Sequence, residues 1–105
     1  MRVYNLPVRD FGSLPWTLGD WELGTDNDGR RTGQRVWVRD YGGPERVLAV
    51  DVRSYMGTAF SFSASLPRRS TVTGHAPDFE LAVRRADYAL DQLILAAFRD
   101  AEEAK

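Results

Sequence analysis

Cysteine is absent from this chain of 105 residues, and histidine and lysine occur once each, at His75 and Lys105. Without cysteine there can be no disulfide framework, no thiolate nucleophile and no zinc or iron–sulfur site with cysteine ligands. A single histidine also lacks the histidine partners, at fixed spacing, that metal and acid–base sites use. We therefore expect His75 to be a loop residue with a local hydrogen bond, and we predict no metal and no cofactor.

Long hydrophobic runs are missing as well. The longest, residues 93–98, is far shorter than the roughly 20 residues of a membrane-spanning helix, and the N-terminus lacks the basic-then-apolar pattern of a signal peptide. We therefore expect a soluble, cytoplasmic protein without membrane contacts. A chain of this length with 43% hydrophobic residues predicts a single domain over residues 1–105.

Motifs for catalysis and for phosphate or calcium binding are not found. The glycines form no phosphate-binding pattern, and Ser61, Ser63 and Ser65 lack the G-x-S-x-G context of a catalytic serine. The acidic turn 26–29 is similar to part of a calcium loop, but Arg35 stands where that loop needs glutamate. We predict that the protein is not an enzyme. An unrecognised enzyme is the third alternative, since a hydrolase that uses only carboxylates, for example, shows no fixed spacing.

The charges of the chain are nearly balanced. There are 14 basic and 15 acidic residues, so the net charge of −1 gives no general attraction to polyanions, and a nucleic-acid site would have to be a local patch. The basic residues are almost all arginine. This bias is a hint of a high-GC genome, such as that of an actinobacterium or one of its phages.

An antiparallel sheet is predicted for the middle of the chain. Residues 35–41, 46–56 and 59–65 are rich in β-branched and aromatic residues and are separated by glycine-containing turns, which is typical of consecutive hairpins. A short strand is expected at 21–25, ahead of the turn 26–29. We divide the chain into an N-terminal arm 1–19, with residues 1–7 an edge strand or a docked arm and 8–19 a loop, a sheet 20–66, a linker 67–76 and a helix 77–102.

The faces of the sheet follow from the alternation of side chains along a strand. A three-residue loop, Gly42–Pro44, sets Val38 opposite Leu48 and Arg35 opposite Asp51. The buried face is then predicted to contain Val36, Val38, Leu48, Val50 and Val52. The next turn has either two residues or three, Met56–Thr58, and we favour three because this places the nearby phenylalanines in the core. The opposite face is predicted to carry Arg35, Trp37, Arg39, Tyr41, Arg53 and Tyr55.

The C-terminal quarter of the chain has the pattern of an amphipathic helix. Pro77 suits the first helical position, and Asp78 and Glu80 suit the positive end of the helix dipole. The apolar stripe predicted to pack on the sheet consists of Phe79, Val83, Ala86, Leu90, Leu93, Ile94, Ala97 and Ala101. The predicted fold class is α+β, an antiparallel β-meander of about four strands with one long helix on one face.

Two surfaces are left as candidates for function. On the open sheet face, arginine and aromatic side chains alternate, which suits protein interfaces and also the binding of unpaired bases. The candidate nucleic-acid contacts are Trp37, Arg39, Arg53, Tyr55, Arg68 and Arg69. On the back of the helix, Leu81, Tyr88 and Leu95 recur every seven residues, opposite the core stripe, and indicate a contact with another chain or with the N-terminal arm.

The sequence therefore predicts a small, non-enzymatic protein-interaction module. Its expected partner is another protein or a second copy of itself, because one helix stripe serves both members of a symmetric dimer. An accessory or host-modulating protein of a phage or an actinobacterium would suit the composition. The alternative is a nucleic-acid-binding module that uses the arginine and aromatic face.

Overall fold

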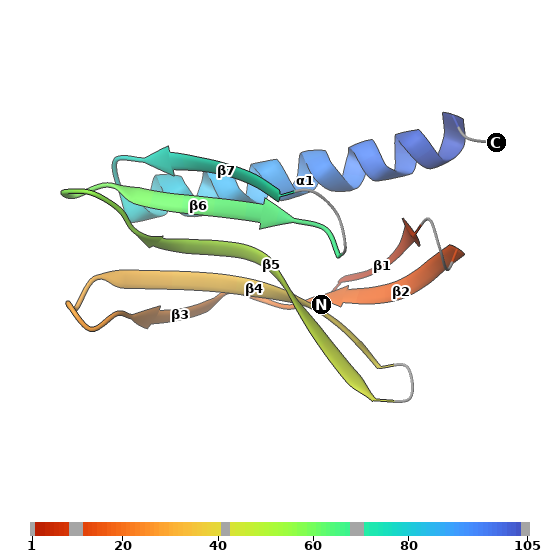
Figure 1. Ribbon diagram of the computed structural model, residues 1–105, viewed down its shortest axis with the longest axis horizontal. Helices are drawn as coiled ribbons and strands as arrows, with labels where there is room; N and C mark the ends of the chain where they lie inside the picture. The colour runs from red at the N-terminus through yellow and green to blue at the C-terminus, as the bar shows by residue number, and fades with distance from the viewer. Residues whose placement is uncertain (1, 9–11, 41–42, 68–70, 104–105) are drawn as a thin grey trace.

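The computed structural model describes residues 2–8, 12–40, 43–67 and 71–103. Within these ranges the chain forms one β-sheet and one long helix, so the predicted α+β class is confirmed (Figure 1). The elements in chain order are β1 (Arg2–Val8), β2 (Gly12–Leu18), β3 (Glu22–Thr25), β4 (Arg31–Asp40), β5 (Pro44–Ser54), β6 (Phe60–Ser65), β7 (Thr71–Ala76) and α1 (Phe79–Glu103).

The strands form the predicted antiparallel meander. Their order is β1-β2-β4-β5-β6-β7, with β3 also paired to β4. β2 meets β4 through Thr17 and Leu18, whereas β3 pairs with residues 31–34 at the start of β4. β2 and β3 therefore behave as one long strand along β4 that is interrupted at residues 19–21.

The described residues form seven strands, more than the four or so that were predicted. The segment 8–19, predicted as a loop, contains β2, and the predicted linker 67–76 contains β7. Pro15 is tolerated in β2 because that part of the strand pairs only with β1. β7 is an edge strand with mostly exposed side chains, so it lacks the apolar alternation by which a strand is recognised. The edge strand that was one alternative for residues 1–7 is present as β1.

A β-bulge in β5 decides which side chains of β4 face the helix. Val36 pairs with Leu48, but the neighbouring Arg35 pairs with Val50, which leaves Ala49 as an extra residue. The extra residue interrupts the alternation, and both Ala49 and Val50 are buried, at 1% and 0% exposure. Arg35 consequently lies opposite Val50 rather than opposite Asp51, as the sequence predicted.

The bulge makes the predicted faces of the first hairpin wrong. Trp37 is fully buried, whereas Leu48 is 39% exposed and shares the uncovered face with its pairing partner Val36. Pro44, predicted to lie in the loop, pairs with Asp40 and begins β5, and residues 41 and 42 lie outside the described residues. The members of the predicted buried set that are buried are Val50 and Val52.

The second hairpin has the favoured three-residue turn. Val52 pairs with Phe62, and the N–H of Tyr55 donates to the carbonyl oxygen of Ala59 at 2.9 Å, which leaves 56–58 as the turn. Gly57 adopts a φ of 65°, a left-handed conformation that suits glycine. The predicted register of β5 and β6 is confirmed.

α1 covers one face of the sheet, lying along β5, β6 and β7 and reaching β1 (Figure 1). The buried side chains of the helix follow the predicted stripe, with Ala82 as an addition: Phe79, Ala82, Ala86, Leu90, Ile94 and Ala97. The side chain of Ala101 lies outside the described residues. The small side chains of the buried alanines, Ala82, Ala86 and Ala97, allow α1 to approach the sheet closely. In the described part of the chain, no helix is long and apolar enough to cross a membrane.

The helix begins two residues later than predicted. Asp78 is the N-cap: its Oδ1 accepts the N–H of Leu81 at 2.8 Å, and its carbonyl oxygen accepts the N–H of Ala82 at 3.1 Å. Pro77 therefore precedes the cap and does not occupy the first helical position. In the first turn, the backbone N–H of Glu80 itself and then its ion pair with Arg31 hold the pKa of Glu80 below its usual value.

Arg30 joins two hairpin turns at the same end of the sheet. Its guanidinium donates to the carbonyl oxygens of Tyr55, Gly57 and Ala59 at 3.1, 2.9 and 3.0 Å, and it lies over the ring of Phe60. The turn after β3 is thereby fastened to the turn after β5. No local sequence motif predicts this contact, because Arg30 and its partners are 25 to 29 residues apart in the chain.

The predicted turn 26–29 is formed and is organised by Asp26. Its Oδ1 accepts the N–H groups of Asp28 and Arg30, both at 2.9 Å, and its Oδ2 accepts the hydroxyl of Ser54 at 3.2 Å. The N–H of Arg30 is the main cause of a lowered pKa at Asp26. These bonds show that the side chain of Asp26 holds the backbone of the turn in place.

Replacing Asp26 by Asn should make unfolding less sensitive to acid. Because the pKa of Asp26 is depressed in the folded state, its ionised form stabilises the protein above the ordinary pKa of 3.8, and this is lost as the pH falls through the lower folded-state value. Urea denaturation from about pH 6 to about pH 2.5 should show a steeper loss of unfolding free energy in the wild type than in the variant. Asp28→Asn is the control, and parallel curves for Asp26→Asn and wild type would contradict the prediction.

Replacing Gly74 by Ala should destabilise the protein. A Cβ at this position would lie 2.5 Å from Cζ of Phe62, whose ring covers the glycine. We expect a loss of about 1–3 kcal/mol in the free energy of unfolding, measured by urea denaturation. Gly19→Ala is the matched control, because its Cβ would meet its nearest atom at 3.5 Å. The loss should shrink when Phe62 is also replaced by Leu, and additive effects of the two substitutions would refute the clash.

Candidate functional site

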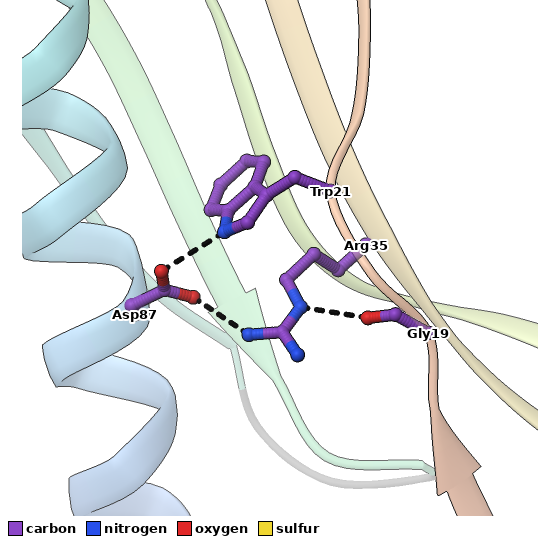
Figure 2. A network of polar contacts seen from close by, with 4 residues as sticks. All are labelled: Gly19, Trp21, Arg35 and Asp87. Carbon is purple, nitrogen blue, oxygen red and sulfur yellow. Dashed lines mark hydrogen bonds and ion pairs between the residues drawn. The ribbon is translucent and has the colours of Figure 1, made fainter. Parts of the chain in front are cut away.

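A polar network ties the helix to the centre of the sheet (Figure 2). Asp87 of α1 accepts two bonds: Nη1 of Arg35 lies 3.0 Å from one carboxylate oxygen, and Nε1–H of Trp21 lies 2.9 Å from the other. Nε–H of Arg35 also donates to the carbonyl oxygen of Gly19 at 2.7 Å, in the interruption between β2 and β3. The side chains of Arg35 and Asp87 are 20% and 36% exposed, so the ion pair is partly shielded from water.

This network is suited to positioning the helix. Both carboxylate oxygens of Asp87 have a donor, and Arg35 is directed toward the helix rather than toward solvent (Figure 2). A paired, hydrogen-bonded arginine at a helix–sheet interface stabilises the packing geometry. Arg35 was predicted to face a partner on the open sheet face, and the bulge turns it to the covered face instead.

Trp37 and Arg39 follow Arg35 onto the covered face. Trp37 is 0% exposed, and its Nε1–H donates to the carbonyl oxygen of Ser65 at 2.9 Å. The guanidinium of Arg39 lies 4.5 Å from the ring centre of Trp16 and forms an ion pair with Glu45 at 2.6 Å. The prediction that Trp37 stacks on bases or binds a partner assumed an exposed side chain. That assumption is wrong, because no part of the side chain is at the surface.

Arg53 and Tyr55 lie on the opposite, uncovered face. Nε of Arg53 is 2.7 Å from Oδ2 of Asp51, and the ring of Tyr55 stacks on that of His75 with the centres 4.2 Å apart. His75 is thus a strand residue with an aromatic neighbour rather than a loop residue. Five of the six residues of the predicted sheet surface are thus divided between two faces. The sixth, Tyr41, lies outside the described residues, as do the candidate contacts Arg68 and Arg69.

The uncovered face has an open hollow of about 540 Å³ over β3, β4 and β5. It is lined by Glu22, Leu23, Gly24, Asp26, Thr32, Gly33, Gln34, Asp51, Arg53 and Ser54. Its charged groups already have partners: Glu22 accepts from Gln34 at 3.1 Å and from Arg46 at 3.3 Å. Across the described residues, no group of three or more His, Asp or Glu side chains is arranged to hold a metal ion.

The outward side of α1 carries the second predicted surface. We call Leu81, Tyr88 and Leu95 the outer stripe. Tyr88 is 66% exposed and Leu95 is 55% exposed, whereas Leu81 is partly buried against the core. The stripe is bordered by exposed polar residues, which are Arg84, Arg85, Asp91, Gln92 and Arg99. Of the outer stripe, Tyr88 and Leu95 are therefore on the exposed side of the helix, and Leu81 also contacts the core.

Sequence reasoning missed a smaller apolar patch on the uncovered face of the sheet. Val36 and Leu48 pair across β4 and β5, and Val38 follows two residues later on the same face. Leu48 is 39% exposed, and the two valines are partly exposed. The only sequence signal was the alternation of valines along β4, and that alternation was assigned to the core.

Asp87→Asn should destabilise the helix–sheet contact. The substitution removes the charge that pairs with Arg35, and because the amide NH2 of Asn cannot accept a hydrogen bond, either Trp21 or Arg35 loses its acceptor. We expect the free energy of unfolding to fall by about 1–2 kcal/mol, together with a change in tryptophan fluorescence. Asp20→Asn is the control, because the carboxylate of Asp20 is exposed and has no partner in the described ranges. Equal stability of the two variants would show that the network contributes nothing.

The chain was compared with protein-family models, with curated protein sequences and with solved structures, and none of these comparisons found a match. Function must therefore be argued from the geometry and exposure of the residues described above.

Proposed function

We propose that this protein is a non-enzymatic interaction module that binds another protein chain through the outer stripe of α1. The observation that carries the proposal is the exposure of Tyr88 and Leu95, at 66% and 55%, in line on one helix face. Isolated exposed leucines are ordinary on protein surfaces. Here the apolar residues recur at a spacing of seven, about two helical turns, so that they line up along one side of the helix.

The chemistry of the outer stripe and its border supports protein binding. Tyrosine and arginine are enriched at the centres of protein interfaces, and an apolar strip surrounded by polar side chains is the usual anatomy of such a surface. A helix packed on one sheet needs only one apolar face, and α1 already has that face in contact with the core. Tyr88 and Leu95 of the outer stripe are therefore not needed for that packing.

The nucleic-acid alternative has lost its main support. It required Trp37 and the neighbouring arginines to lie together on an open face, and Trp37 is buried. For the module as proposed, an accessory or host-modulating role fits the arginine-rich, lysine-poor composition that favours a phage or actinobacterial origin.

Photocrosslinking tests the proposed surface. A benzoylphenylalanine introduced at Tyr88 or at Leu95, in cells that express the protein, should form covalent adducts with a protein partner on irradiation. The same residue at Asp28, in the exposed turn between β3 and β4, is the control and should form none. Leu95→Asp should abolish the adduct made from position 88, because a charge in the stripe opposes burial. No adduct from either helix position, or equal adducts from position 28, would refute the proposal.

A further inference from the structure

Building on the proposed function, we propose that the partner is a second copy of this chain, with the two α1 helices antiparallel and a two-fold axis at Tyr88. The inference rests on how the charges are distributed on the two sides of the outer stripe. Because an α-helix has 3.6 residues per turn, Arg84 and Asp91 border the stripe on one side, and Arg85 and Gln92 border it on the other. All four side chains are exposed.

Antiparallel pairing about Tyr88 brings complementary groups together. A two-fold axis perpendicular to the helices sets the same side of each stripe against the same side of its partner. Leu81 then meets the partner's Leu95, and Tyr88 meets the partner's Tyr88. On one side of the stripe, Arg84 lies beside the partner's Asp91, and the two residues are offset along the helix axis by less than one helical turn. On the other side, Arg85 lies beside the partner's Gln92. The symmetry makes each of these contacts twice.

Other ways of pairing the helices bring like charges together. Parallel helices would set Arg84 beside the partner's Arg85. Antiparallel helices with the axis moved halfway toward Leu95 would set Asp91 beside the partner's Asp91 on one side and Arg85 beside the partner's Arg99 on the other. Like charges in such positions are destabilising. Antiparallel helices also bring each positive helix end near a negative one. The arrangement about Tyr88 is the one that the charges favour.

The residues needed for the intermolecular ion pair are free to make it. The ion pairs formed within the described residues involve neither Arg84 nor Asp91. From Leu81 to Leu95 the outer stripe spans about 21 Å of helix, which is long enough for several layers of contact but makes a small interface. We therefore expect dissociation in the micromolar range, about 1–100 µM.

Charge exchange between Arg84 and Asp91 tests both the partner and the geometry. Sedimentation equilibrium of the purified protein from about 1 µM to about 1 mM should show a reversible dimer for the wild type. Arg84→Asp alone places two acids together, and Asp91→Arg alone places two arginines together, so each variant should dimerise at least about tenfold more weakly. The double variant, and an equimolar mixture of the two single variants, should regain dimerisation. Circular dichroism and urea unfolding confirm that each variant is folded.

The possible outcomes separate this inference from the proposed function. Recovery in both the double variant and the mixture supports the antiparallel pair, because a parallel pair or an unrelated partner predicts no such recovery. Weakening by the single variants without recovery overturns the register. A wild type that stays monomeric at about 1 mM overturns self-association; if position 88 still crosslinks to a different protein, the proposed function stands. A monomeric wild type that yields no adduct refutes both.

Discussion

One extra residue in β5, Ala49, fixes the arrangement of the whole molecule. On one side of the bulge, Trp37 of β4 pairs with Val47 of β5 and faces inward. On the other side of the bulge, Val50 and Val52 of β5 also face inward. Without the extra residue, one of these two groups would have to face water, because side chains alternate along a strand. The bulge therefore allows a single face of the sheet to hold both the large indole ring and the valines. That face is the one on which α1 packs.

The position of the helix on this face is set by apolar packing and by a polar anchor together. Small residues such as Ala82 and Ala86 bring α1 close to the sheet, and Asp87 reaches sideways to Arg35 and Trp21. Apolar contacts alone tolerate some rotation of a helix about its axis, whereas a carboxylate with two fixed donors does not. By fixing this rotation, the anchor also determines which side chains point outward, and so links the interior of the protein to the surface that we propose for binding.

The extent to which sequence alone predicts this structure depends on how local each signal is. The helix stripe and the three-residue turn at 56–58 are correct because they follow from periodicity and from neighbouring residues. The prediction of which β4 side chains are buried is wrong because a bulge shifts the alternation, and no feature of the composition indicates the bulge. β7 was not predicted because an exposed edge strand has no apolar pattern. Contacts such as those of Arg30 and of Asp87 join residues far apart in the chain, so no spacing rule reveals them. Of the candidate surfaces, the outer stripe kept its predicted exposure at Tyr88 and Leu95, while the sheet surface was divided between two faces.

Arg85 of α1 binds the backbone of β7, the strand at one edge of the sheet. Its Nη1 donates to the carbonyl oxygen of His75 at 2.6 Å, and this carbonyl belongs to β7, the last strand of the sheet. Unpaired backbone groups on an edge strand are templates onto which strands from other molecules can add, and such addition can continue without limit. A guanidinium seated on one of these carbonyls blocks an incoming strand and places a positive charge at the point of approach. Through Arg85, α1 therefore hinders the addition of a further strand at β7.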